Sequence, residues 1–215
     1  MSNPLFDTLF RPTTAPISGV ASAAPVQTKG THTRAGNAMS RTRVSLLSGA
    51  ARAVEANGTK ITMAQVASSA GVAKATLYNH FRTREAVLAA LLVDQVRTIV
   101  DEQTGKPLEL ALADAAAALA RHPVRRGLAR VEPATLAQLG CIDASTEAWQ
   151  YARAGVAAAL VAAQRGGTDT VLRWLASYLL TPAGALSIAA DVAVLLAGLP
   201  VLASAADPLG RSRTA

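Results

Sequence analysis

The chain has 215 residues, of which 51% are hydrophobic and only 4% aromatic, and its formal net charge is +7. This length supports one or two domains with a real core, and the dominance of alanine and leucine over β-branched runs predicts an all-α protein. The single cysteine, Cys141, excludes an intrachain disulfide and fits a reducing cytoplasm.

The positive charge is concentrated in one part of the chain. Residues 29–91 contain nine basic and two acidic residues, whereas residues 92–215 contain eleven of each sign. Localised positive charge suits a polyanionic partner, because cationic side chains neutralise phosphates and release counterions. A solvated basic face is the alternative, and charge alone does not separate the two.

Neither end of the chain predicts a membrane protein. No charged region followed by an apolar run marks the N-terminus, so we expect no signal peptide and a cytoplasmic location. Residues 185–206 are mostly apolar over about the length that spans a bilayer. Because Asp191 lies inside this stretch and Gly198 and Pro200 interrupt it, we favour a buried or dimer-interface helix.

The first 38 residues predict a flexible extension, since they are rich in Pro, Thr, Ser, Ala and Gly without periodicity. Lys29, His32 and Arg34 make its last third basic, which suits either an ordinary solvated tail or an arm that contacts DNA. Ser40 is a suitable N-cap for a first helix that ends near Ala56. Its apolar face is predicted from the spacing of Val44, Leu47, Ala51 and Val54.

Residues 61–81, ITMAQVASSAGVAKATLYNHF, predict two short helices around a glycine turn. Thr62 caps the first of them, with Gln65 placed three residues on as in a capping box. Gly71 suits a positive φ at the turn, and Leu77 and Phe81, four residues apart, should face inward from the second helix. The buried side of the first helix is predicted to contain Ala64, Val66, Ala67 and Ala70.

The outward side chains of this stretch suit contacts with DNA phosphates. Thr62 offers a hydroxyl and free N–H groups at a helix start. Lys74 and Arg84 are cations that bracket the second helix, and Tyr78 and His80 can donate to phosphate oxygens. An ordinary corner between two helices would also contain a glycine, so the turn alone is a weak signal. The polar, acid-free outward face and the surrounding charge favour a DNA-binding helix-turn-helix.

Two further side chains are short enough to reach base edges or a thymine methyl group in the major groove, namely Thr76 and Asn79. The complete predicted DNA-facing set is Thr62, Ala73, Lys74, Ala75, Thr76, Tyr78, Asn79, His80 and Arg84.

The rest of the chain predicts further helices. A long one begins near Thr83 as N-cap and ends by Gly105, long enough to link two domains. The later helices are predicted at 108–121, 124–131, 133–139, 145–165, 168–180 with Thr168 as cap, and 186–199. The last of these is apolar nearly all round, which predicts burial on several sides.

No enzymatic or cofactor site is expected. The three histidines lack metal-ligand spacing, Cys141 has no local histidine, and no phosphate-binding glycine loop occurs. We therefore predict no catalytic residue, no metal and no cofactor. The weak candidates for a ligand pocket are the aromatic residues Trp149, Tyr151, Trp174 and Tyr178, each of which also suits plain core. An anionic ligand could meet Arg125, Arg126 and Arg130, for which a solvated face is the favoured alternative.

The segment TMAQVASSAGVAKATLYNHFRTREAVLAALL resembles the DNA-binding region of the TetR family of bacterial transcriptional regulators. The matching features are Ala67, the turn at 70–72, Thr76-Leu77-Tyr78, His80-Phe81, Arg84-Glu85 and Leu88, and the resemblance covers about residues 40–92. Two positions depart from the usual pattern. Ala73 replaces a serine that would cap the helix and touch phosphate, and Arg84 replaces a lysine while keeping its charge.

The resemblance implies an all-helical homodimer whose variable C-terminal domain pairs the subunits and often holds a small-molecule pocket. It assigns dimerisation mainly to 168–180 and 186–199. The predicted organisation is an extension at 1–38, a DNA-binding domain at 39–84, a dimerisation and effector domain at 85–206, and a tail at 207–215.

The function predicted from the sequence is a repressor that leaves a palindromic operator when an unknown effector binds. A nonspecific architectural DNA-binding protein and a regulator anchored through 185–206 are the alternatives.

Overall fold

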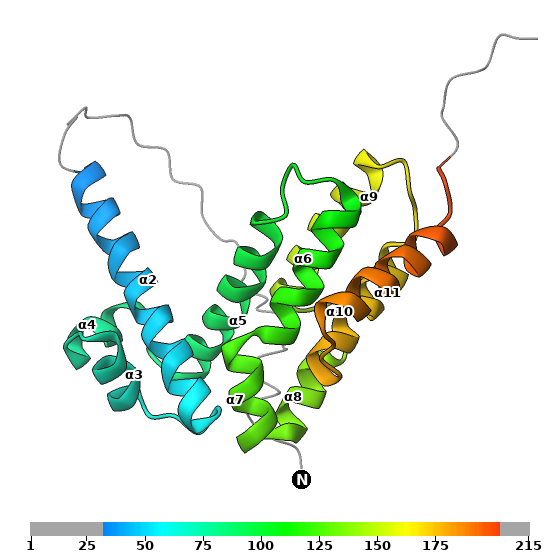
Figure 1. Ribbon diagram of the computed structural model, residues 1–215. Coiled ribbons are helices and arrows are strands. Elements are labelled where there is room, and N and C mark those ends of the chain that lie inside the picture. Colours follow the sequence, from blue (N-terminus) through cyan, green and yellow to red (C-terminus); the bar gives the residue numbers. More distant parts are fainter. Residues whose placement is uncertain (1–31, 203–215) are drawn as a thin grey trace, which may run out of the picture.

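The computed structural model describes residues 32–202 of the chain, and the side chains of residues 39–202. Ten helices account for nearly all of this part, with one isolated bridge between Arg165 and Val201, so the predicted all-α class is confirmed (Figure 1). The helices are α2 (His32–Asn57), α3 (Met63–Ala70), α4 (Lys74–His80), α5 (Arg84–Asp101), α6 (Leu108–Arg121), α7 (Pro123–Val131), α8 (Pro133–Gly140), α9 (Glu147–Ala162), α10 (Thr168–Leu180) and α11 (Ala185–Gly198).

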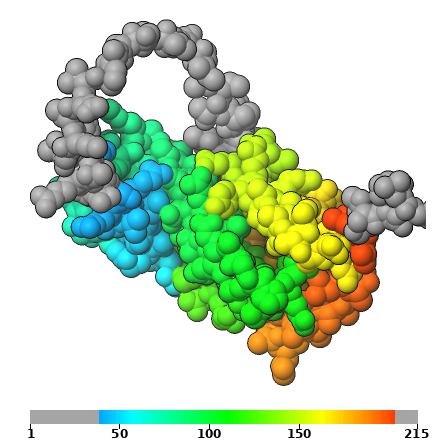
Figure 2. Space-filling model, turned by 90° about the horizontal axis from the view of Figure 1, so that it is seen from above, coloured from blue at the N-terminus to red at the C-terminus, as the bar shows by residue number. Residues whose placement is uncertain are grey.

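The described part is elongated. Helices α2, α3 and α4 form one end, and α10 and α11 lie at the other, as the blue and orange regions of Figure 2 show. The predictions for the tail at 207–215 and for the first 31 residues lie outside the described residues.

Helix α2 differs from its prediction in both start and facing. It begins at His32 rather than after Ser40, because no proline interrupts the chain between Pro25 and Pro107. Its buried face contains Leu46, Leu47, Ala50, Ala53 and Val54, whereas Val44 is 59% exposed. The predicted face was therefore wrong at Val44, since spacings of three and four fit two adjacent stripes of one helix.

The predicted N-cap of α3 and the predicted glycine turn at its C-terminal end are confirmed. The Thr62 hydroxyl accepts from the Gln65 backbone N–H at 3.2 Å, and the Gln65 side chain accepts from the Thr62 N–H at 2.7 Å. These two bonds form the predicted capping box. Gly71 then ends α3 with φ of 68°, a left-handed conformation that most side chains avoid.

The closest approach of α2 and α3 occurs at Gly49. A Cβ placed there would lie 2.5 Å from backbone and side-chain atoms of Ala70, so only glycine allows this crossing. Val66 and Ala67 face inward as predicted, but Ala64 is exposed. Ala64 precedes the buried Val66 by two positions, which places it about 200° away around the helix.

Two hydrophobic clusters divide the interior. The first joins α2, α3, α4 and the start of α5 to Leu128 of α7 and Leu136 of α8. The second joins α6, α9, α10 and α11. Helix α5 begins at the predicted N-cap Thr83, whose hydroxyl accepts from the Ala86 N–H, and it extends from the first cluster toward the second.

One helix start and one helix cap in the second half differ from prediction. Helix α9 begins at Glu147, two residues after the predicted start at Ser145, and its N-cap is Thr146. The N-cap of α10 is Gly167, with φ of 95°, whereas Thr168 lies inside the helix and gives no side-chain cap. Glycine is required at position 167 for two reasons. It tolerates the positive φ, and it leaves room for the Leu199 side chain, which would lie 2.6 Å from a Cβ.

The C-terminal end of α2 is joined tightly to α7 and α8. Gly127 of α7 packs so closely against the Glu55 backbone that an added Cβ would overlap the Glu55 carbonyl oxygen. Arg130 donates to the Glu55 and Ala56 carbonyls. Glu132 accepts from the Thr59 hydroxyl at 2.5 Å and from the Thr59 backbone N–H at 3.2 Å. These contacts attach the end of the molecule that contains α2 to α7 and α8.

Helix α11 is far less buried than its composition predicted. Within the single chain only Ile188 and Val192 of this helix are buried, while Leu186 is 90% and Val194 76% exposed. Asp191, the one charge in this helix, accepts a hydrogen bond from Tyr178 at 2.8 Å. With 14 residues, α11 is too short to cross a bilayer, and none of the other described helices is both long and apolar enough.

Candidate DNA-binding surface

Helix α4 is fixed by two inward anchors. Leu77 and Phe81 are both buried in the first cluster, and the Arg43 guanidinium of α2 lies 4.9 Å above the Phe81 ring. A cation over an aromatic face adds electrostatic attraction to this packing. Phe81 also ends the helix, because its backbone is extended with φ of −137° and ψ of 118°, while its N–H still donates to the Leu77 carbonyl at 2.8 Å. The anchors hold one side of α4 and leave the opposite side outward.

The outward side of α4 is polar and free of acids. Lys74, Ala75, Tyr78 and Asn79 are exposed, with Tyr78 at 46%, and Thr76 and His80 are half-buried. Lys74 has no ion-pair partner among the described residues, so its ammonium is available to a phosphate. The structure thus brings six of the nine predicted residues onto one short helix.

The start of α4 lacks a side-chain cap, as the alanine at its N-cap predicted. Ala73 has the extended geometry of an N-cap, with φ of −66° and ψ of 146°, but no side chain that can accept from the first turn. The backbone N–H groups at this end are therefore left for solvent or for a phosphate.

Two predicted phosphate contacts are already engaged within the chain. The Thr62 hydroxyl takes part in the capping box, although the residue is exposed. Arg84 pairs with Glu85 at 2.8 Å through Nη2 and at 3.0 Å through Nε. The pKa of Glu85 lies below its usual value. The main cause is a hydrogen bond that its carboxylate accepts from its own backbone N–H, and the Arg84 side chain adds to the effect. A phosphate would have to share Arg84 with this carboxylate.

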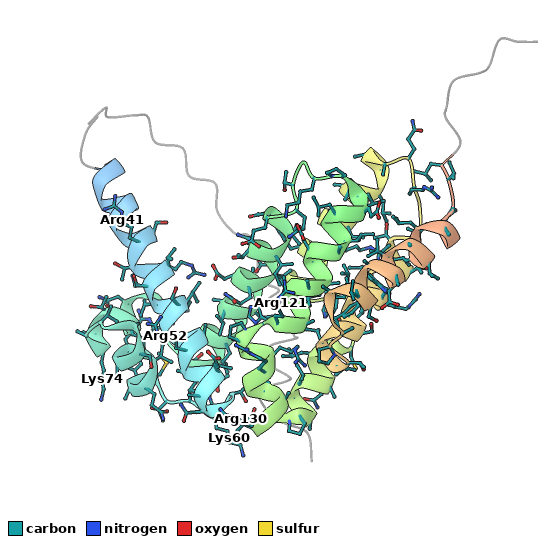
Figure 3. All side chains as sticks on the ribbon, in the orientation of Figure 1. Arg41, Arg52, Lys60, Lys74, Arg121 and Arg130 are labelled. Carbon is teal, nitrogen blue, oxygen red and sulfur yellow. The ribbon has the colours of Figure 1, made fainter. Side chains whose placement is uncertain are left out.

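Other cations lie near the same surface. Lys74 points outward from α4 at the edge of the molecule, with Arg41 and Arg52 along the neighbouring α2 (Figure 3). Arg52 is engaged, because it donates to the Ser69 carbonyl at the end of α3. Arg82, directly after Phe81, is exposed and was not assigned a role from the sequence. Its position two residues beyond the end of α4, in the most basic part of the chain, was the available signal.

A second candidate site is an apolar pocket between the two hydrophobic clusters. Its volume is about 550 Å³, and residues of α2 and of α5 to α10 line it. Of the aromatic residues predicted as ligand contacts, only Trp149 lines this pocket. Tyr151 instead donates to Asp101 at 2.7 Å, and Trp174 packs edge-on against Tyr178 at 5.1 Å between ring centroids. These three aromatic residues have roles elsewhere in the fold.

The arginines predicted as contacts for an anionic ligand divide similarly. Arg125 lines the pocket, but its Nε donates to the Ala120 carbonyl and its Nη1 to the Leu179 carbonyl. Arg126 and Arg130 are exposed and contact the end of α2, Arg126 through Glu55 at 3.8 Å. Their clearest role is structural, because they bond the C-terminal end of a helix, where cations are favoured.

A short polar helix, anchored on its inner side and presented outward by a glycine turn, defines a helix-turn-helix DNA-binding protein. Residues 46–91 match the family model described as bacterial regulatory proteins, tetR family. Residues 46–91 therefore form the DNA-binding region of a TetR-family transcriptional regulator, and this family is one of DNA-binding proteins and not of enzymes.

Solved structures with similar folds include a TetR-family transcriptional regulator from Mesorhizobium loti MAFF303099. It has 18% sequence identity and a TM-score of 0.52, over 76% of this chain and 98% of that one. A γ-butyrolactone receptor described as an ArpA-like protein has 20% identity and a TM-score of 0.44, over 78% and 91%. A TetR-family regulator from Rhodococcus sp. has 19% identity and a TM-score of 0.43, over 73% and 97%. No curated protein matches the sequence.

Proposed function

We propose that this regulator is a homodimeric repressor that binds a pseudo-palindromic operator and leaves it when a small molecule enters the pocket. We assign DNA binding to a domain at 39–84, and dimerisation and effector binding to 85–206. The terminal segments at 1–38 and 207–215 are proposed to lie outside both. The outward surface of α4 is the observation that carries the proposal.

The DNA contacts are proposed to come from both helices of the motif. In this arrangement Thr76 and Asn79 reach base edges, while Lys74, Tyr78 and His80 contact phosphates. The uncapped N–H groups that follow Ala73 would bind a further phosphate, with Ala75 beside them. Thr62 and Arg84 would contribute at the edges of the same surface. The absence of acidic residues along α4 supports this assignment.

The two-fold partner is proposed to be a second copy paired through α11. Its exposed residues Leu186, Ala190 and Val194 follow one another at intervals of four, so they form one apolar stripe. Alanines at 189, 193 and 197 flank this stripe and would let two helices approach closely. The outward side of α10 is more polar, with Asp169, Arg173 and Ser177, so α10 contributes less than the sequence predicted.

Effector control is proposed to act through the joint between α2 and α7. Val54 and Thr59 line the pocket, and they belong to the segment that joins the pocket to α3 and α4. We call α3 and α4 together the reading head. Thr59 is also the residue bound by Glu132 at the start of α8. A molecule that pushes α7 or α8 outward would therefore shift the end of α2, and with it the separation of two reading heads in a dimer.

Two experiments in sequence test the proposal. The protein first selects bound fragments from a random DNA pool, and the selected sequence and a shuffled control are then titrated at equal salt. We expect a two-fold symmetric sequence that binds at least about a thousandfold more tightly than the shuffled one. Similar affinity for both would favour the architectural alternative. A single chain per duplex in sedimentation would contradict the dimer.

A further inference from the structure

We propose that the pocket takes an uncharged, elongated and largely aliphatic molecule with one hydrogen-bonding head group. This inference rests on the proposed function in one respect only, namely that the pocket is the effector site. It concerns the chemistry of the ligand, which the family membership leaves open.

The lining of the pocket is aliphatic along most of its length. Its volume of about 550 Å³ suits a molecule of ordinary ligand size. Among the described residues that line it, Trp149 and His122 supply the only rings, and leucine, valine and alanine supply most of the remaining surface. Burial of a flexible apolar chain against such a surface is favourable by the hydrophobic effect alone.

The pocket gives a cation no partner. No aspartate or glutamate occurs among its described lining residues. An ammonium group that entered would lose its hydration without gaining a carboxylate, and burial of an unpaired charge is strongly unfavourable. The scarcity of aromatic rings also removes the alternative of a cation–π cage.

The two cations of the lining are already engaged. Lys106 lies 2.7 Å from Asp114 and 3.1 Å from the Gln103 side-chain oxygen. Arg125 donates to two carbonyl groups, those of Ala120 and Leu179. An anionic ligand would have to break these contacts to gain a counter-charge. The charge balance of the wall therefore favours a neutral molecule over one of either sign.

His122 and Gln95 form the hydrogen-bonding position. The His122 Nε2 lies 2.7 Å from the Gln95 side-chain oxygen, and both residues line the pocket. Because an amide oxygen only accepts, Nε2 carries the proton and Nδ1 is left as an acceptor. Burial holds the pKa of His122 below its usual value, so the ring is neutral near pH 7. A ligand hydroxyl can donate to such a nitrogen.

The test compares two probes that share a ten-carbon chain, 1-decanol and decyltrimethylammonium. The full-length Trp174→Phe variant leaves Trp149, in the pocket wall, as its single tryptophan reporter. We expect 1-decanol to change the Trp149 emission with a Kd at least about tenfold lower than that of the cation. Equal affinity, preference for the cation, or no binding of 1-decanol would overturn the proposal.

Matched variants on α9 connect the signal to the pocket. Ala159 lines the pocket, whereas Ala154 is exposed and does not. Ala159→Phe should raise the Kd of 1-decanol at least about tenfold, and Ala154→Phe should leave it unchanged. His122→Phe keeps a ring but removes the acceptor, and should weaken 1-decanol about fivefold. Equal effects of the two α9 variants would overturn the location.

The titration with 1-decanol contains no DNA, so its result does not depend on whether the protein is a repressor. Binding of 1-decanol without any effect on operator affinity would leave the ligand chemistry standing and refute control by the pocket. A sequence-specific repressor whose pocket prefers the cation would refute the ligand chemistry alone.

Discussion

Helices α4 and α11 each leave one side uncovered, but the two surfaces differ in chemistry. The uncovered side of α4 contains Lys74, Tyr78 and Asn79, whereas that of α11 contains Leu186, Ala190 and Val194. The first suits a hydrated polyanion, and the second suits another apolar surface. We therefore propose a different kind of partner for each surface, and the following substitutions test the two surfaces separately.

The largest effect is expected on α11. Ala190→Glu places a charge in the middle of the apolar stripe while leaving the buried side of the helix intact. We expect light scattering to return the mass of one chain, and operator affinity to fall at least about a hundredfold because two linked reading heads become independent. The control Ala144→Glu, in the exposed turn before α9, should remain dimeric. A dimeric Ala190→Glu protein would refute the role of α11.

The next largest effect is expected at the crossing of α2 and α3, which supports α4. Gly49→Ala introduces a Cβ 2.5 Å from Ala70 atoms, so α2 and α3 must separate. We expect the free energy of unfolding in urea to fall by about 2 kcal/mol, because the overpacking cost exceeds the gain in helix propensity. The neighbouring Ser48→Ala, exposed on the same helix, should be neutral or slightly stabilising. Equal stability of the two variants would disprove the tight crossing.

Lys74→Ala probes the charge on the surface of α4. Operator affinity should fall about tenfold, and the slope of log K against log salt should become shallower by about one unit. Tyr78→Ala should weaken binding by about fivefold with little change in slope, since it removes a neutral contact. Arg173→Ala, exposed on α10 at the other end of the molecule, serves as the control. If all three proteins bound alike, α4 would not be the contact surface.

The smallest effect is a gain. Ala73→Ser supplies the missing N-cap of α4 at a residue whose backbone is already extended. We expect thermal unfolding to report about 1 kcal/mol of added stability, together with somewhat tighter operator binding through the new hydroxyl. An unchanged melting temperature would mean that solvent already satisfies the first turn of α4.

The sequence predicted best those features that depend on near neighbours. The capping box at Thr62, the turn at Gly71 and the inward pair Leu77 and Phe81 each involve residues within four positions, and all are present. The bounds of α10 were predicted correctly, but its N-cap was not, because Gly167 takes a left-handed conformation there and Thr168 gives no side-chain cap. The DNA-facing residues could be grouped from helical periodicity, but the Arg84–Glu85 pair shows that periodicity does not reveal which cations remain free.

Contacts between distant segments could not be predicted. Glu132 and Thr59 are 73 residues apart, and no local pattern connects a carboxylate at a proline-led helix start with a threonine after α2. The same holds for Gly127 against Glu55, and for a pocket assembled from seven helices. Such features depend on how the helices cross, which the linear periodicity of each helix does not determine.

Site-directed crosslinking tests the central assignment most directly. In a Cys141→Ser background, which removes the single native cysteine, Asn79→Cys would carry a photo-crosslinker at the outward surface of α4. With the selected operator we predict crosslinks to bases at two positions related by the two-fold axis of the site. A protein that crosslinks from a cysteine at Ser177 of α10 but not from Asn79 would contradict the assignment of α4 as the reading helix.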